Sequence, residues 1–274
     1  MTEIPIFPLR SVLCPGLALP LHIFEERYRL MIARCIERGE PFGVVLLREG
    51  QEVGPLAGQI AAVGTTAAIR RAGAYPDGRL DILTVGQQRF RLEGLDQVSE
   101  PYLLGQVSLL DEPTGPEPEL RERAQRVGQQ FLEYLELLQP TDELDGPEIE
   151  IEFEIEVDES EADEPESGSV EPGERGEPGT LDADVADASP EERRRLLMAA
   201  ARRLVDTDDP PALSELMTAL IQVDLAVRQE LLEAPDTLDR LTRLDGLLTR
   251  ENWFLRQGLR PILIDARPAR SQRG

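Results

Sequence analysis

The sequence predicts an α+β protein, in which a β-rich N-terminal part is followed by a helical C-terminal part. Residues 1–111 contain short apolar or alternating runs separated by turn residues, which is typical of strands. From Glu117 onward, apolar residues recur with the period of a helix. Residues 141–190 are rich in acidic residues, proline and glycine. A length of 274 residues suits one or two domains.

The strand-like runs are short and closely spaced. Turn residues separate them, notably Pro76-Asp77-Gly78 and Gly86. Such spacing indicates a small barrel or sandwich. The runs are PFGVVLLREG, QIAAVGTTAAIRRAG, GRLDILTVG, QQRFRLEGL and PYLLGQVSLLD.

One helix is expected among these strands, from Glu25 onward. Its apolar residues fall at i, i+3, i+4, i+7 and i+8, and Gly39 follows as a stop signal. The apolar residues are Tyr28, Met31, Ile32, Cys35 and Ile36.

Helical periodicity returns in the last part of the chain. The segment Glu117 to Leu138 carries one apolar stripe, and Pro140 closes it. Ser189-Pro190-Glu191-Glu192 has the capping serine, early proline and acids of a helix start. The short helices predicted after it suggest a compact bundle. They lie in DPPALSELMTALIQ, VRQELLEAPD and TLDRLTRLDGLLTRENWFL.

The negative charge is concentrated in one segment. The net charge is −24, and residues 141–190 hold 20 acidic residues against one basic residue, Arg175. This composition cannot bury enough apolar area to offset the entropy of ordering, so it predicts disorder. Within it, EIEIEFEIEVD would form a strand with one apolar and one anionic face. The tract is therefore a solubilising linker, an autoinhibitory strand or a segment that binds a partner.

The chain contains no lysine, because all 29 basic residues are arginine. A G-x-x-x-x-G-K-[ST] phosphate loop, a Schiff base and a lysine-activated serine all need one. A single histidine excludes H-E-x-x-H, and two cysteines exclude a cysteine-rich zinc site. We therefore expect no metal and no cofactor.

No apolar run approaches the length that crosses a bilayer, and the N-terminus has no signal-peptide pattern. We expect a soluble, cytoplasmic protein that does not bind membranes.

The N-terminal stretch carries groups that suggest a catalytic site: Cys14, the only histidine, His22, and Glu25. An imidazole can activate a thiol, but such sites depend on spatial geometry and not on closeness in sequence. Free cysteine is among the most buried residue types. We favour a core thiol and a histidine that helps to start the helix at Glu25.

Arginines recur along the later predicted strands. With Phe90 and Tyr75 to stack on bases, they would suit an RNA-binding face. The alternation in RFRL is equally that of a solvated strand face, and the acidity of the chain favours this second interpretation. The arginines are Arg70, Arg71, Arg79, Arg89 and Arg91.

Several segments occur in the order of a known family: IPIFPL, PGLALPLHIFEERYRLMI, FGVVLL, VGTTAAI, DGRLDILTVGQQRFRL and PYLLGQV. Over about residues 3–111 they resemble the N-terminal substrate-binding domain of the Lon protease family, and more closely its stand-alone bacterial members. The helical segment after the acidic tract is similar to the bundle that follows this domain in Lon. The resemblance implies a PUA-like β-barrel with one packed helix, then a helical bundle. The implied division is a barrel at 1–112, a connecting helix at 113–139, an acidic disordered insertion at 140–188 and the bundle at 189–268.

The resemblance implies a non-catalytic module that binds exposed apolar or unfolded polypeptide, as an adaptor or regulator of proteolysis. Lon hydrolyses ATP and cleaves peptides in downstream domains. Because the chain ends where these would begin and lacks lysine, we expect neither activity. The alternatives are a PUA-like RNA-binding protein, which the charge disfavours, and a scaffold for a folded partner. The candidate polypeptide-binding residues lie near the N-terminal motif: Phe7, Leu9, Arg10, Phe24 and Tyr28.

Overall fold

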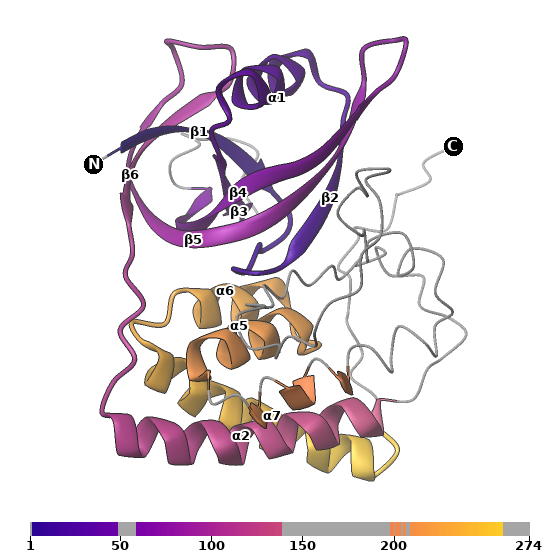
Figure 1. Ribbon diagram of the computed structural model, residues 1–274, viewed down its shortest axis with the longest axis vertical. Coiled ribbons are helices and arrows are strands. Elements are labelled where there is room, and N and C mark those ends of the chain that lie inside the picture. Colours follow the sequence, from indigo (N-terminus) through magenta and orange to yellow (C-terminus); the bar gives the residue numbers. More distant parts are fainter. Residues whose placement is uncertain are drawn as a thin grey trace, which may run out of the picture.

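The computed structural model describes residues 2–48, 59–138, 198–199, 201–203, 205–206 and 209–259. In these residues the chain forms a β-barrel with a helical bundle beside it, shown one above the other in Figure 1. The segment EIEIEFEIEVD, the rest of the acidic tract and the helix start predicted at Ser189 lie outside the described residues.

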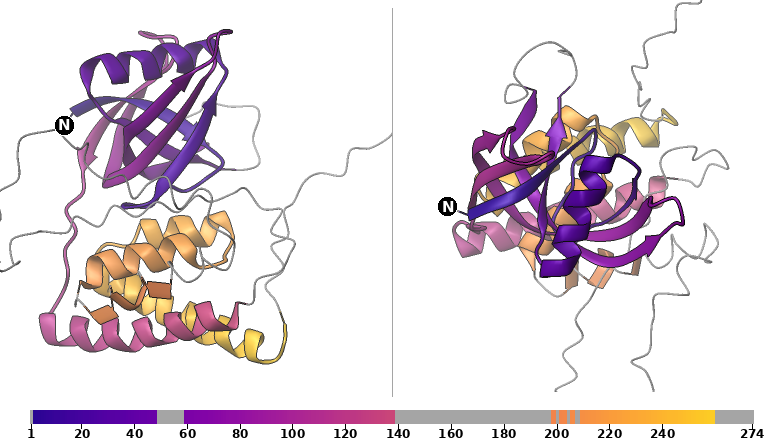
Figure 2. Two further views of the ribbon diagram at one scale, coloured as in Figure 1. Left: turned by 45° about the vertical axis from the view of Figure 1, so that its right-hand side comes forward. Right: turned by 90° about the horizontal axis from the view of Figure 1, so that it is seen from above.

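The N-terminal part is a six-stranded sheet that closes on itself (Figures 1 and 2). The strand order is β2-β5-β4-β3-β1-β6, and the sheet closes because β5 also pairs with β6. β1 and β3 run parallel, whereas the other pairs are antiparallel. Of the two architectures that the strand spacing indicated, the protein has the barrel. The strands are β1 (Thr2–Leu9), β2 (Ala18–Ile23), β3 (Phe42–Leu47), β4 (Ile60–Ala74), β5 (Leu80–Asp96) and β6 (Leu103–Leu109).

β5 is a single strand, although the sequence predicted two strands separated at Gly86. That prediction was wrong, because Gly86 serves a close approach between backbones and not a turn. A Cβ atom at Gly86 would lie 2.3 Å from the carbonyl oxygen of Cys14. The backbone of Gly86 accepts a hydrogen bond from Gly16 (2.8 Å) and donates one to Leu17 (2.9 Å).

Helix α1 (Glu26–Arg38) covers one end of the barrel (Figure 1). Four members of the predicted apolar stripe are buried, while the fifth, Ile36, is exposed. The helix ends as predicted at Gly39, whose φ of 64° is a left-handed conformation that glycine adopts without steric cost. The local sequence pattern therefore predicted both the packed face and the end of this helix.

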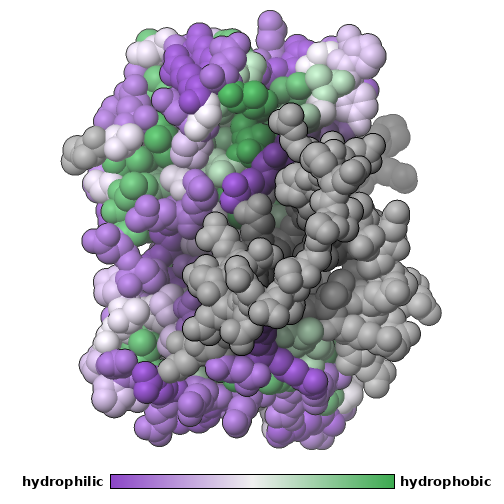
Figure 3. Space-filling view, viewed as in Figure 1, coloured by the Kyte–Doolittle hydropathy of each residue, from purple (hydrophilic) through white to green (hydrophobic). Residues whose placement is uncertain are grey.

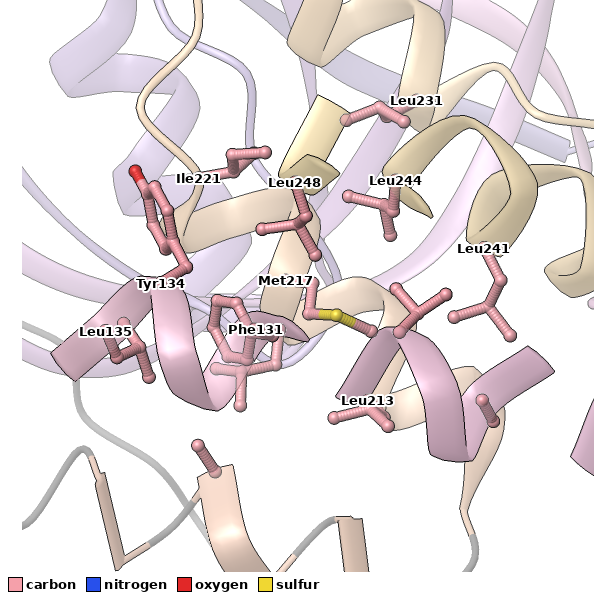
Figure 4. Close-up of a cluster of buried hydrophobic side chains, with 14 of the residues drawn as sticks. Phe131, Tyr134, Leu135, Leu213, Met217, Ile221, Leu231, Leu241, Leu244 and Leu248 are labelled. Carbon is pink, nitrogen blue, oxygen red and sulfur yellow. The ribbon is translucent and has the colours of Figure 1, made fainter. Parts of the chain in front are cut away.

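The helical bundle contains α2 (Glu117–Leu137), α5 (Pro210–Leu220), α6 (Leu225–Leu232) and α7 (Thr237–Arg256). Aspartates at positions 209, 224 and 236 cap the last three helices through side-chain oxygens. Figure 4 shows Phe131 of α2, Met217 of α5 and Leu248 of α7 converging in one apolar cluster. The helix expected as a connector at 113–139 thus contributes its apolar stripe to the bundle core. None of the described helices is long and apolar enough to cross a membrane.

The barrel and the bundle share a small apolar core of their own. Leu232 of α6 and Ala219 of α5 pack there against barrel residues Val12, Cys14 and Val63. The amide of Gln229 on α6 also donates a hydrogen bond of 2.9 Å to the carbonyl oxygen of Val63. The bundle therefore covers part of the barrel surface, which affects where an exposed site can lie.

Candidate functional site

Part of the sheet projects beyond the closed barrel, and we call it the wing. It consists of β2 (Ala18–Ile23), the first part of β5 (80–85) and the end of β4 (69–74). β3 pairs with β4 only as far as Ala67, so among the described residues no strand lies on the other side of the end of β4. Leu21 and Leu80 on one face of the wing pack against the cluster that includes α1. The opposite face is the one that α1 leaves open.

Three rings meet at the outer end of the wing, and we call them the aromatic cluster: His22, Phe24 and Tyr75. The His22 and Phe24 rings are stacked with their centroids 6.2 Å apart, and the Tyr75 ring meets His22 edge-on at 6.1 Å. Phe24 is 64% exposed and Tyr75 is 43% exposed. Large rings at this exposure leave apolar area in contact with water, which a ligand could cover.

Asp81 holds two of these rings in place. Its carboxylate lies 2.6 Å from His22 Nδ1 and accepts a hydrogen bond from the Tyr75 hydroxyl. Hydrogen bonds from Tyr75 and from His22 keep the pKa of Asp81 below its usual value, and the same contact with Asp81 raises the pKa of Tyr75. The Arg79 guanidinium lies over the Tyr75 ring at 5.3 Å. His22 and Tyr75 are thus positioned before any ligand arrives.

A shallow depression of about 500 Å³ lies at the N-terminal end of α1, lined by Glu25, Glu26, Arg27, Leu30 and Pro101. Figure 3 shows hydrophobic side chains reaching the surface mainly over the barrel part of the face in view, whereas the bundle part is mostly hydrophilic. The apolar exposure of this face therefore belongs mainly to the barrel.

The five binding residues that the sequence suggested differ in their exposure to solvent. Phe24 and Arg10 are exposed, and Leu9 is partly buried against the barrel core. Phe7 and Tyr28 are both buried, with their ring centroids 4.3 Å apart. These two rings pack α1 on the barrel, and their burial disfavours direct contact with a ligand.

Sequence reasoning missed Tyr75 and Asp81 as partners of His22. Asp81 lies 59 positions from His22, and only the pairing of β2 with β5 sets them side by side. The one local signal was the turn Pro76-Asp77-Gly78, which places Tyr75 at a hairpin tip.

Cys14 and His22 lie in different surroundings. Cys14 is buried where the barrel meets the bundle, and burial raises the pKa of its thiol to about 12. A thiolate is therefore scarce at neutral pH. His22 is on the wing with Asp81, and Glu25 pairs with Arg27 at 2.8 Å. Cys14 fits the core-thiol interpretation, whereas His22 bonds to β5 and does not cap α1.

The arginines considered as a basic face do not share one environment. Arg89 is buried, contrary to the solvated strand face that RFRL suggested, and Phe90 is buried in the barrel interior. Arg70, Arg71 and Arg79 are exposed on the wing. Within the described ranges, no three His, Cys, Asp or Glu side chains come together as a metal site requires.

A family model described as the ATP-dependent protease La (LON) substrate-binding domain matches residues 3–250. The Lon protease of Parabacteroides distasonis is 34% identical over 120 residues, which are 43% of this chain and 14% of that protein. The Lon protease of Escherichia coli K12 is 28% identical over 136 residues, which are 49% of this chain and 17% of that protein. The matched region thus spans well under a fifth of these relatives.

Two solved structures share the fold. The crystal structure of a Lon N-terminal domain protein from Xanthomonas campestris matches with a TM-score of 0.50 and 21% identity, over 90% of this chain and 98% of that chain. The N-terminal domain of the Mycobacterium avium complex Lon protease matches with a TM-score of 0.55 and 14% identity over the same shares. At such identities the likeness concerns the fold alone. Because the family model covers most of the sequence, the chain belongs to the LON substrate-binding domain family.

Proposed function

We propose that this chain is a non-catalytic binding module that recognises exposed apolar or unfolded polypeptide and acts as an adaptor or regulator of proteolysis. The observation that carries the proposal is the aromatic cluster on the wing. Two of its exposed rings are held in place by hydrogen bonds to Asp81, and Phe24 stacks beside them, so the cluster offers large apolar contact area at little entropic cost, as at the energetic centres of protein interfaces. Phe24 is the member with the most exposed area.

The chemistry of the chain supports binding without catalysis. Across all 274 residues there is no lysine for a phosphate loop or a Ser–Lys pair. His22 lies beside Asp81 and Tyr75, and the contact with Asp81 raises the pKa of the Tyr75 hydroxyl, so this hydroxyl is a poor nucleophile at neutral pH. RNA is the less favoured ligand, because Arg89 and Phe90 are buried and the net charge is −24.

Fluorescence anisotropy with a labelled, reduced and carboxymethylated polypeptide tests this proposal on the full chain. Truncating a central interface ring typically costs at least about 2 kcal/mol, so Phe24→Ala should weaken binding roughly thirtyfold. Because the contact is apolar, raising the salt concentration should change the affinity little.

Trp253→Ala is the matched control, since Trp253 is a comparably exposed ring (56%) on the bundle. It should bind as tightly as the native chain. Absence of binding by the native chain, or an equal loss in both variants, would reject the proposal. The protein would then be treated as a scaffold for a folded partner.

A further inference from the structure

β2 is paired along one edge only. It runs antiparallel to β5 from Ala18 to Ile23, and within the part of the chain that the structure describes no strand lies along its other side. An unpaired edge presents backbone N–H and C=O groups that can bond to another strand.

Two hydrogen bonds establish which backbone groups face outward. The Gly86 amide of β5 donates to the carbonyl oxygen of Leu17, and the Thr84 hydroxyl donates to that of Leu19, at 2.9 Å each. In an antiparallel ladder the residues alternate between facing the partner and facing away. Leu19 and Leu21 therefore bond toward β5, whereas Pro20 and His22 present their backbone groups to the open side.

The open section of the edge is short and well defined. Ala18 is buried, while Pro20 and His22 are exposed. Pro20 lacks an N–H group, so this section offers its carbonyl oxygen together with the N–H and C=O of His22. A proline is tolerated at such a position because its missing donor faces solvent.

The chemistry of the edge favours an uncharged, extended occupant. The strand ALPLHI contains no carboxylate and no arginine, so the backbone of an apolar segment can pair with its outer edge without covering a charged side chain of that strand. The other open edge of the wing, at the end of β4, carries the exposed Arg70 and Arg71. Charged residues on an edge discourage strand addition.

The aromatic cluster lies at the end of this edge. Directly paired residues share a face of the sheet, so an added strand would place alternate side chains beside His22 and its neighbour Phe24. We infer that an extended client segment with aromatic or large apolar residues at alternate positions adds as a strand to the outer edge of β2, with those side chains on the aromatic cluster. This inference rests on the proposed function and states how the polypeptide is held.

Backbone methylation of the ligand tests the inference. A short synthetic peptide alternating phenylalanine and serine is compared with the same peptide carrying N-methyl groups on alternate residues, in both phases. In one of the two methylated peptides the N–H donors that would face β2 are removed, so this peptide should bind at least about tenfold more weakly than the unmethylated one. The other methylated peptide should bind as tightly as the unmethylated one. Equal binding of all three peptides would overturn strand addition but leave the proposed function standing. No binding by any of them would overturn both.

A pair of variants tests the same contact from the protein. His22→Ala removes the ring but keeps the outward N–H, whereas His22→Pro removes both. Because that N–H does not bond to β5, the two variants should unfold at similar denaturant concentrations. Peptide binding to His22→Pro should be roughly tenfold weaker than to His22→Ala. Equal affinities of the two folded variants for the peptide would contradict strand addition. Self-association of the native chain would also contradict it, if His22→Pro abolishes the association and the peptide does not displace it. A second copy of the chain would then occupy the edge.

Discussion

The guanidinium of Arg89, on barrel strand β5, donates a 2.7 Å hydrogen bond to the carbonyl oxygen of Leu232, the last residue of α6. It donates a second, of 2.8 Å, to Ala234 and pairs with Glu112. The side chain is 3% exposed. A buried cation thus bonds to the negative end of a bundle helix and joins the two halves of the molecule.

Removing this cation should strongly destabilise the protein. Arg89→Ala leaves Glu112 without this partner and two carbonyl groups without donors, so we expect a loss of about 3–5 kcal/mol in the free energy of unfolding. Arg89→Lys keeps the charge but loses the forked guanidinium geometry, so its free energy of unfolding should lie between those of the native chain and Arg89→Ala. Urea denaturation of the full chain measures both.

Arg91→Ala is the control for Arg89, because Arg91 lies on the same strand and is exposed. Its effect should stay within about 0.5 kcal/mol. If Arg89→Ala were equally mild, Arg89 would not join the barrel to the bundle energetically.

A second prediction concerns the carboxyl of Glu215 on α5, which lies with Arg89 at the junction where the barrel meets the bundle. Its pKa is raised from 4.5 to about 7; burial is the largest cause, Arg240 and Arg89 oppose the rise, and Glu112 adds to it. Between about pH 4.5 and about pH 7, Glu215 keeps its proton in the folded state but has lost it in the unfolded state. The contribution of Glu215 to stability therefore falls as the pH rises from about 4.5 to about 7.

Glu215→Gln removes this dependence, since glutamine does not titrate. As the pH rises from about 5 to about 8, the free energy of unfolding of the variant should increase relative to that of the native chain by on the order of 3 kcal/mol. The comparison uses urea midpoints at both pH values, with Glu37→Gln on the exposed side of α1 as the control. A constant difference between Glu215→Gln and the native chain would show that Glu215 ionises normally in the fold.

The close approach at Gly86 gives a third prediction. The new Cβ of Gly86→Ala would meet the backbone of Cys14 at 2.3 Å, so we expect a loss of about 1–3 kcal/mol. Gly94→Ala, on the same strand, meets only Gln106 at 3.7 Å and should be tolerated. Thermal unfolding of the two variants separates the effects. Similar melting temperatures would mean that the backbone at Cys14 moves aside easily.

Phe7 and Phe24 should respond oppositely to truncation. Phe7→Ala removes a buried ring that packs on Tyr28 and should cost about 3–5 kcal/mol of stability. Phe24→Ala should leave stability within about 0.5 kcal/mol and instead weaken polypeptide binding. Urea denaturation and anisotropy on the same two proteins provide the check. A strongly destabilised Phe24→Ala would place Phe24 in the fold and not in the site.

Local patterns were sufficient for most of the elements. The spacing of apolar residues predicted α1, α2, α5 and α7, and Gly39 predicted where α1 ends. These features depend on residues within a few turns of one another, so a single sequence contains the information for them. The ordered N-terminal segments were specific enough to indicate the family.

Only the tertiary structure decided which side chains meet. The sequence RFRL predicted a solvated Arg89, yet the bundle covers that face and buries it. His22 and Asp81 become neighbours only through the pairing of β2 with β5. By itself, the sequence determined the periodicity of the elements, the family pattern and the absence of lysine. The folded chain determined the wing and the junction, because contacts between segments far apart in the chain leave no trace in local periodicity.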